Sequence, residues 1–268
     1  MRGALRAALL AGYAFLYVPL ALMVAFSFNA SRLLTVWSGF SWRWYVALWH
    51  DGPLVASALL SLRIALAAAT LATAVGAAAG LVLARGGRFP GRAAFAGVAA
   101  VPLVLPDVVI GLSLLLLFVA LGVARGAATI TIAHASFALA YVAVVVQGRL
   151  ADLGPVLEEA AADLGARPSV VFATVTLPLL APALVSGWLL AFTLSLDDVV
   201  VASFVSGPGA TTLPMVLFSQ LHLGATPEVF ALATVVMAVV AACLLAAWAV
   251  PAMSRRAIRP VAAPGAGA

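Results

Sequence analysis

The stretch Glu159-Ala160-Ala161-Ala162-Asp163-Leu164-Gly165, followed at Val175-Thr176-Leu177-Pro178 by a helix-breaking end, decides how the rest of the chain is interpreted. It is a short acidic segment that lies between long apolar runs. An apolar run of about 20 residues is long enough to cross a bilayer, whereas a charged segment between two such runs belongs outside it. We therefore expect this stretch to form a cytoplasmic surface at which a soluble partner acts on a membrane protein.

A short helix is predicted within this stretch. Asp152-Leu153-Gly154-Pro155 is a helix-start signal, because Asp or Gly can cap a helix and Pro suits its first position. The helix runs to about Leu164, and Gly165 is placed to end it in a left-handed conformation. Its apolar face and its acidic side are, respectively, Leu157, Ala160, Ala161 and Leu164, and Glu158, Glu159 and Asp163.

The alternative for this segment is an amphipathic helix that lies on the membrane surface. Such helices usually carry Lys or Arg on the polar face, where they meet anionic lipid. The polar side here is acidic, which favours a protein partner. Further along, Pro168 can open a second helix, which Pro178 and Pro182 are expected to break before the next apolar run.

The composition is that of a membrane protein. Hydrophobic residues make up 65% of the 268 residues and charged residues only 9%, against about 25% in a soluble domain. We predict an all-α polytopic membrane protein whose single transmembrane domain covers residues 1–260, before a flexible cytoplasmic tail at 261–268. Six spans are predicted, with the acidic loop 152–178 between the fourth and the fifth: about 5–26, 54–83, 94–121, 127–146, 183–205 and 229–250.

The basic residues predict the orientation in the membrane. All 14 are Arg, and ten of them lie on alternating segments counted from the N-terminus, against four on the other side or at its edge. The positive-inside rule therefore places both termini, and the Glu159 segment, in the cytoplasm. The first apolar run is longer than a usual signal-peptide core and has no convincing cleavage site, so we interpret it as a retained anchor.

The same residue counts exclude several functions. A P-loop needs a Lys to reach the phosphates, and this chain has none, so any ATP hydrolysis must occur in another subunit. The Arg residues form no basic stripe, which argues against nucleic-acid binding. His50, His134 and His222 are too far apart in sequence for a metal motif, and no nucleophile–base pair suggests an enzyme. No cofactor is expected on this chain.

Two segments are expected on the outer side. Residues 29–52 carry a cluster of Trp and Tyr that fits an interfacial aromatic belt or, alternatively, a docking surface for an external protein. Residues 206–228 begin Gly207-Pro208-Gly209 and continue into an apolar-leaning stretch. This pattern predicts a turn followed by a short helix near the outer interface.

Three of the nine acidic residues, Asp107, Asp197 and Asp198, lie in or beside apolar runs. A carboxylate at the bilayer centre costs about 2.5–3.5 kcal/mol on insertion scales, so it normally faces a water-filled path or a partner. A cationic substrate passing along these carboxylates would supply the missing charge. The alternative is that Asp197 or Asp198 caps a broken helix or bonds to a neighbouring subunit.

Other residues near these acids point to the same region. Pro102 and Pro106 suggest that the third span is interrupted close to Asp107. Trp188 and Phe192 could stack on amines as cation–π partners, although aromatic residues at helical spacing more often serve ordinary packing.

The spacing Glu159-Ala160-Ala161, then Gly165, then nine residues to Val175-x-Leu177-Pro178 resembles the EAA loop of ABC-importer permeases. In that family the loop forms a coupling helix that fits a cleft on the ATPase subunit. The resemblance implies a type I importer permease fold with this helix between the fourth and fifth spans. It implies ATPase-coupling roles for Glu158, Glu159, Ala160, Ala161, Asp163, Leu164, Gly165 and Pro178.

A wider resemblance covers nearly the whole chain. Pro106-Asp107 with Gly111-Leu112-Ser113-Leu114-Leu115, the run from Gly187 to Val201, and Gly207-Pro208 with Pro227-Glu228 are similar to the second inner-membrane permease of the spermidine/putrescine type. This implies polyamine import across the bacterial inner membrane, with Asp107, Asp197 and Asp198 on the substrate path.

The expected partners follow from the same resemblance: an ABC ATPase dimer that uses ATP and Mg²⁺, a second homologous permease, an external solute-binding protein, and membrane lipid. Two alternatives remain, an ABC permease for another small cationic solute and a secondary transporter. A secondary transporter would show inverted repeats and a coupling-ion site. We find no convincing repeat, and that function leaves the acidic loop unused.

Overall fold

The computed structural model describes residues 2–32, 36–223 and 227–257, and in this part of the chain the regular structure is helical. Beyond the helices it contains one isolated bridge, between Asn29 and Phe40. The helices, in chain order, are α1 (Arg2–Ser27), α2 (Arg43–His50), α3 (Gly52–Arg85), α4 (Arg92–Ala100), the 3-10 turn η1 (Val101–Leu103), α5 (Asp107–Ala120), α6 (Ala127–Leu153), α7 (Val156–Asp163), α8 (Pro168–Val171), the π-helical turn η2 (Phe172–Thr176), α9 (Leu177–Asp197), α10 (Val200–Val205), α11 (Leu213–Leu223) and α12 (Pro227–Ala257).

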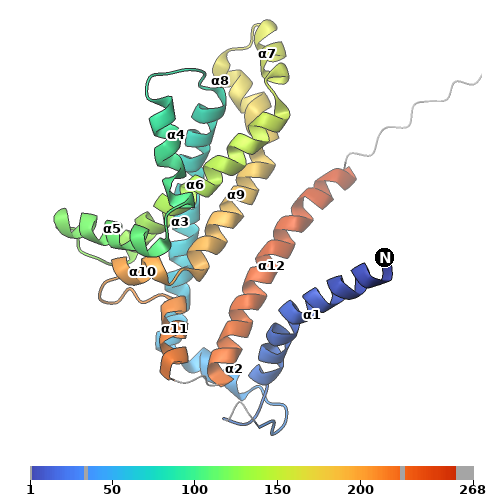
Figure 1. The fold of residues 1–268 in the computed structure, drawn as a ribbon, viewed down its shortest axis with the longest axis vertical. Helices are drawn as coiled ribbons and strands as arrows, with labels where there is room; N and C mark the ends of the chain where they lie inside the picture. The colour runs from blue at the N-terminus through green and yellow to red at the C-terminus, as the bar shows by residue number, and fades with distance from the viewer. Residues whose placement is uncertain (1, 33–35, 224–226, 258–268) are drawn as a thin grey trace, which may run out of the picture.

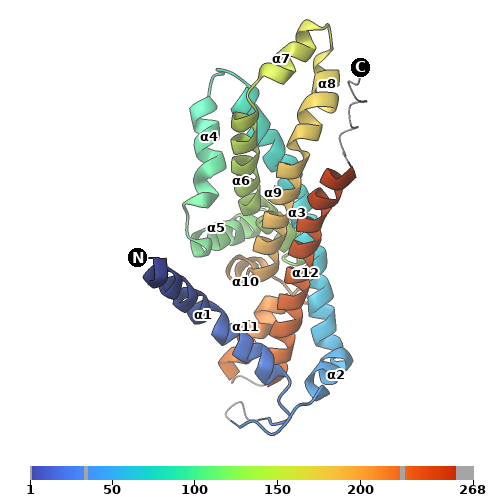
Figure 2. The same cartoon turned by 90° about the vertical axis from the view of Figure 1, so that its right-hand side faces the viewer.

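The centre of the molecule is a bundle of α3, α6 and α9 (Figures 1 and 2). Small residues let these helices approach closely. A methyl group on Gly76 would lie 2.5 Å from the carbonyl oxygen of Leu139, and one on Gly80 would lie 2.8 Å from that of Ala143. This Gly-x-x-x-Gly spacing on α3 is a common basis of close helix packing in membranes. The buried side chains of the bundle are correspondingly small, and many are Ala or Val: Ala65, Ala69, Ala72, Ala133, Ala138, Val142, Val146, Ala183 and Ala191.

The two ends of the bundle carry different elements. Helices α7 and α8 form one end, and α2 and α11 form the other (Figure 1). Helix α1 packs against α12 and otherwise projects away from the bundle (Figures 1 and 2). Its apolar side chains are largely exposed, with Phe15 81% exposed.

Four helical segments are long and apolar enough to cross a membrane: Leu5–Ser27, Gly52–Arg85, Ala127–Leu153 and Pro168–Asp197. The pair Arg92–Leu103 and Asp107–Ala120 passes the same test together but is bent by 111°, so up to five spans are present in the described part. The sixth predicted span, 229–250, falls in α12, whose described apolar part, Pro227–Ala242, is shorter than a span. The all-helical membrane fold is therefore confirmed, whereas the count of six is not.

The third predicted span, 94–121, is not one continuous helix. It breaks between Leu103 and Asp107, next to the two prolines that suggested an interruption, and α5 turns across the bundle (Figure 1). Pro106 precedes the first residue of α5 and has an extended backbone (φ −59°, ψ 141°). The residue before a proline disfavours the helical backbone, so the first helix ends at Leu103 and a new helix direction begins at Asp107.

The fifth predicted span, 183–205, has the wrong limits. The helical segment runs from Pro168 to Asp197, stops at Asp198 and Val199, and α10 follows as a separate short helix. Pro178 does not break the helix, because it lies in the first turn of α9, where a backbone N–H is not needed. Pro182 is accommodated inside α9. The expected break before this span is therefore wrong, and the actual break lies at its other end.

Candidate functional site

The two broken spans meet at one place in the bundle. Helix α5, which follows the first break, packs on α10, which follows the second (Figure 1). A methyl group on Gly111 of α5 would lie 2.7 Å from the Phe204 ring and 3.3 Å from the Cα atom of Val201. Glycine is thus required for α5 to lie this close to α10. The contact brings the chain near Asp107 toward the chain near Asp197 and Asp198.

Asp198 lies in the second break, and its carboxylate is held by three hydrogen bonds. Its carboxylate accepts hydrogen bonds from the backbone N–H groups of Val201 (3.3 Å) and Ala202 (2.7 Å) in the first turn of α10. This is helix capping, the alternative role that the sequence left open. His134 on α6 lies 3.2 Å away through Nε2, and its Nδ1 lies 2.7 Å from the hydroxyl of Ser195.

The two contacts of His134 fit the tautomer that carries its proton on Nε2. A neutral imidazole with its proton on Nε2 donates to Asp198 and accepts from the Ser195 hydroxyl through Nδ1. His134 is 1% exposed, so this arrangement satisfies a fully buried ring. The side chain of Asp198 is 9% exposed. Asp198 is therefore fixed in position by α6, whereas the sequence alone indicated only that His134 belongs to no metal motif.

Asp107 and Asp197 are held differently. Both residues are exposed, and neither carboxylate is paired with a cationic or hydroxyl side chain in the described part of the chain. Asp197, Asp198, Asp107 and His134 are close enough to interact electrostatically. Asp107 also lies in the first turn of α5, where the helix dipole favours a negative charge. The structure thus gathers the three carboxylates at the two breaks and leaves two of them accessible.

The two predicted aromatic residues lie on α9. Trp188 and Phe192 are stacked, with ring centroids 5.4 Å apart and an interplanar angle of 7°. Phe192 is 2% exposed and belongs to the core, while the indole N–H of Trp188 donates to Thr70 (3.2 Å). Phe192 therefore has the packing role that was its alternative. A substrate contact for either residue stays a prediction.

Near the opposite end of α9, the short helix predicted after Pro155 is present as α7. Gly165 has φ +83°, its N–H donates to the carbonyl of Ala162 (2.8 Å), and the N–H of Ala166 donates to that of Ala161 (3.2 Å). This pair of bonds is the Schellman motif that ends a helix with glycine. The predicted left-handed end is confirmed.

The two sides of α7 differ from the sequence prediction. Glu158, which was assigned to the outward acidic side, faces the bundle and is half-buried, whereas Leu157 and Leu164 of the apolar face are 53% and 90% exposed. Glu159, Ala160 and Asp163 are exposed, and Ala161 is half-buried. A helical wheel cannot distinguish a face that packs on the protein from one that is open to a partner. The exposed side of α7 therefore carries the apolar Leu157 and Leu164 together with the acidic Glu159 and Asp163.

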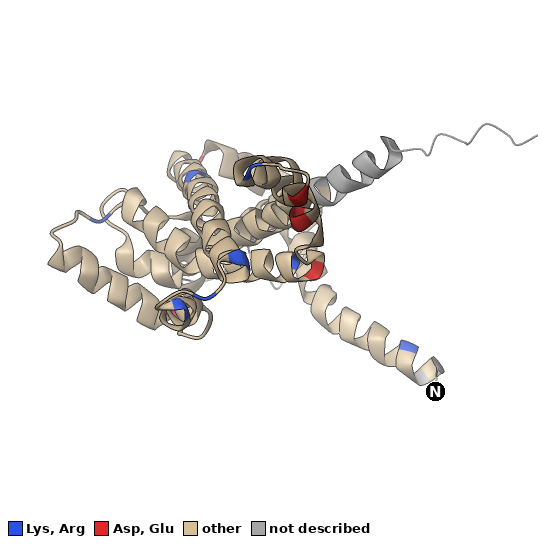
Figure 3. Ribbon diagram, turned by 90° about the horizontal axis from the view of Figure 1, so that it is seen from above, with Lys and Arg blue, Asp and Glu red and all other residues tan. Residues whose placement is uncertain are grey.

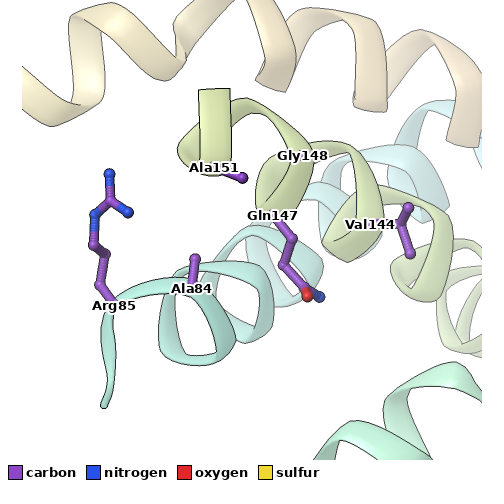
Figure 4. A pocket seen from close by; sticks show the side chains of 6 residues that line it. All are labelled: Ala84, Arg85, Val144, Gln147, Gly148 and Ala151. Atoms are coloured by element: carbon purple, nitrogen blue, oxygen red, sulfur yellow. The ribbon is translucent and has the colours of Figure 1, made fainter. Parts of the chain in front are cut away.

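Arg85, at the end of α3, is the residue that binds Glu158. Its Nε atom donates to Glu158 Oε2 (2.8 Å), and its other donors reach the carbonyl oxygens of Leu150 (3.1 Å) and Gly154 (2.7 Å). An open cavity of about 420 Å³ lies beside Arg85, between the last turn of α3 and α6 (Figure 4). Sequence analysis used Arg85 only for orientation, because nothing in a single sequence pairs it with Glu158.

The Arg residues of the described part do not gather on one surface. Seen from the α7 end, the Arg positions in the described part are dispersed over several elements rather than aligned in a stripe (Figure 3). This distribution agrees with an orientation signal in the loops and helix ends rather than with a polyanion-binding surface.

The sequence is similar to that of known transport proteins. Residues 76–259 match the family described as binding-protein-dependent transport system inner membrane component. The chain is 54% identical over 246 residues to the putrescine transport system permease protein PotI of Escherichia coli strain K12, covering 90% of this chain and 88% of that protein. It is 45% identical over 225 residues to the spermidine/putrescine transport system permease protein PotC of Haemophilus influenzae, covering 84% and 87%.

The fold has a counterpart among solved structures. A chain of a bacterial ABC transporter involved in the import of the acidic polysaccharide alginate superposes with a TM-score of 0.67 at 17% identity, over 94% of this chain and 95% of that one. At this identity the similarity concerns the fold alone. It confirms the predicted importer-permease fold.

Proposed function

Because this chain belongs to the family of inner-membrane components of binding-protein-dependent transport systems, we propose that it forms half of the translocation path of an ATP-driven polyamine importer. The observation that carries the substrate class is the group of three carboxylates at the two helix breaks. Relatives of this chain are named for putrescine and for spermidine/putrescine transport. A polyamine carries several ammonium groups along a flexible chain, which spaced carboxylates can bind in succession.

The three carboxylates have different roles in this proposal. Asp107 and Asp197 are exposed and bind the ammonium groups directly, whereas Asp198 contributes a negative charge held in place by His134 and α10. Passage through a membrane requires sites that bind strongly enough to admit the ion and weakly enough to release it. One fixed and two accessible carboxylates supply such sites without binding the polyamine so tightly that it cannot leave. The other half of the path belongs to a second permease, so the active unit is a heterodimer.

Helix α7 couples this path to an ATPase. Its exposed face, with Leu157, Leu164 and Glu159, docks in a cleft of one subunit of an ABC ATPase dimer, which binds ATP and Mg²⁺. The chain itself hydrolyses nothing and binds no cofactor. The segments at the α2 and α11 end receive the external solute-binding protein. In this proposal both termini lie in the cytoplasm, and the chain lies in the bacterial inner membrane, surrounded by lipid.

The proposal is tested by purification and ATP hydrolysis. This chain is expressed with its cognate second permease and ATPase, purified through a tag on this chain, and assayed with binding protein that is empty or loaded with putrescine or spermidine. We expect the ATPase to co-purify and its rate to rise several-fold with polyamine-loaded binding protein. An ATPase that co-purifies but responds only to a different solute would contradict the polyamine assignment. Failure of the ATPase to co-purify would contradict the coupling role.

A further inference from the structure

The carboxylate of Glu158 makes two bonds that lead to two different membrane helices. Oε2 accepts from Nε of Arg85 at the end of α3 (2.8 Å), and Oε1 accepts from the hydroxyl of Thr176 at the start of α9 (2.9 Å). Arg85 and Glu158 have side chains that are 26% and 22% exposed. A half-buried ion pair with a charge-assisted geometry is stronger than an exposed one, because water and salt screen it less. Helix α7 is thus tied to α3 and α9 by one side chain.

Arg85 adds a third helix to this connection. Its guanidinium donates to the carbonyl of Leu150, in the last turn of α6, and to that of Gly154 just beyond it. The last four carbonyls of a helix have no partner within the helix, so an Arg side chain that reaches them stabilises the helix end. Arg85 therefore holds the ends of α3 and α6 together with α7 (the cavity beside it is seen in Figure 4).

Thr176 links the carboxylate of Glu158 to the start of helix α9. It is 6% exposed and is the last residue of the π-helical turn η2, directly before α9. Single π-helical turns inside helices are frequent at functional sites. Helix α9 has 21 residues, or about 30 Å at 1.5 Å per residue, and ends at Asp197. A displacement of Thr176 is therefore applied to the helix whose other end carries Asp197, next to Asp198.

The residues of this connection are separate from the exposed face of α7. Glu158 faces the bundle, whereas Leu164 is 90% exposed on the side open to a partner. A change in the connection can therefore leave docking intact and still change how α7 moves with the bundle.

We propose that Arg85, Glu158 and Thr176 form a clamp that transmits the movement of α7 to α3, α6 and α9. The clamp positions the coupling helix and contacts neither substrate nor nucleotide. The inference rests on the proposed coupling function of α7. It assigns the step between ATPase and membrane path to three residues, of which Glu158 and Thr176 lie in the loop 152–178 and Arg85 lies at the end of α3.

The test uses the complete importer in proteoliposomes with variants of the clamp. The most informative pair is Thr176→Val, which keeps the shape but removes the hydroxyl, and Thr176→Ser, which keeps the hydroxyl. Arg85→Ala and Glu158→Gln complete the set. Arg88→Ala is the matched control, because Arg88 is exposed and has no hydrogen bond or ion pair in the described part of the chain. Co-purification of the ATPase, stimulation of ATP hydrolysis by loaded binding protein, and uptake are measured for each variant.

We expect Arg85→Ala and Thr176→Val to retain the ATPase but to lose at least tenfold in uptake, with ATP hydrolysis no longer stimulated by loaded binding protein. Thr176→Ser should restore most of the uptake, and Arg88→Ala should match the wild type. Uptake and stimulation at the wild-type level in both Arg85→Ala and Thr176→Val would overturn the clamp. Loss of the ATPase from these two variants would also overturn it, because the residues would then serve assembly.

A companion variant on the exposed face separates this inference from the function on which it rests. Leu164→Asp places a charge where the ATPase is proposed to dock and should abolish co-purification. If Leu164→Asp has this effect while the clamp variants behave as wild type, the coupling function stands and the clamp is wrong. If Leu164→Asp changes neither co-purification nor uptake, α7 is not the coupling helix, and both proposals are overturned.

Discussion

Nε2 of His134 lies 3.2 Å from Oδ2 of Asp198, and this contact fastens the break between α9 and α10 to the middle of α6. Removing the imidazole with His134→Ala leaves Asp198 with only its backbone donors and leaves the Ser195 hydroxyl without its acceptor. A hydrogen bond to a charged group contributes about 1.5–3 kcal/mol, and 1.4 kcal/mol corresponds to a tenfold change in affinity. We expect the KM of uptake to rise about tenfold or more and the temperature of thermal unfolding to fall.

His134→Gln can retain one of the two bonds and should have a smaller effect. His222→Gln is the matched control, since in the described part of the chain the exposed His222 contacts the carbonyl and the ring of Phe218 in its own helix. Equal KM values for His134→Ala and His222→Gln would show that His134 does not position Asp198.

The three carboxylates should separate into two classes when each is neutralised. Asp107→Asn and Asp197→Asn remove accessible charges that bind no other side chain, so they should weaken uptake of a polyamine several-fold with little change in thermal stability. Asp198→Asn also weakens the cap of α10, and such a loss costs about 0.5–2 kcal/mol. It should therefore lower uptake and the unfolding temperature together. The account is contradicted if neutral Asp107 and Asp197 leave the KM unchanged.

The end of α7 should be sensitive to any side chain at Gly165. A methyl group there meets no atom within 4 Å, so the effect of Gly165→Ala comes only from its φ of +83°. A left-handed conformation costs a non-glycine residue about 1–2 kcal/mol. We expect the helix end to loosen, and uptake per ATP hydrolysed to fall.

Gly148→Ala is the same chemical change within α6, also with nothing within 4 Å of the added methyl. In a helix interior it should be neutral or stabilise by about 0.5–1 kcal/mol. If Gly165→Ala and Gly148→Ala give the same stability and the same coupling ratio, the Schellman end of α7 has no part in coupling.

Close packing of α3 on α6 should make Gly76 and Gly80 intolerant of a methyl group. Gly76→Ala would bring its Cβ within 2.5 Å of the Leu139 carbonyl oxygen, so the helices must separate. Overpacking of this kind typically costs about 1–3 kcal/mol. Thermal unfolding in detergent should show the loss, whereas Gly97→Ala in α4, which meets nothing within 4 Å, should not. Similar unfolding temperatures for Gly76→Ala and Gly97→Ala would rule out this close contact.

Local sequence signals predicted the end of α7 and the break before α5. Gly165 was sufficient to predict the end of α7, because few residues other than glycine adopt a left-handed backbone at such a position. Pro102 and Pro106 likewise predicted the break before α5. The capping role of Asp198 was one of two alternatives, since an acid beside a helix start can serve either purpose.

Contacts between residues far apart in the chain could not be predicted from the sequence. Glu158 was placed on the outward side of α7, because helical periodicity gives faces but not what each face meets. The partner of Glu158 is 73 positions away, at Arg85, and that of His134 is 64 positions away, at Asp198. The start of α9 was also misplaced, since Pro178 fits the first turn of a helix as well as it ends one.

The central claim, that this chain is half of an ATP-driven polyamine path, is tested most directly by uptake of labelled putrescine and spermidine into proteoliposomes that hold the assembled importer. The account predicts accumulation that requires ATP, the binding protein and the second permease, and that falls when Asp107 and Asp197 are neutralised. Accumulation by this chain alone, driven by an ion gradient, would contradict it.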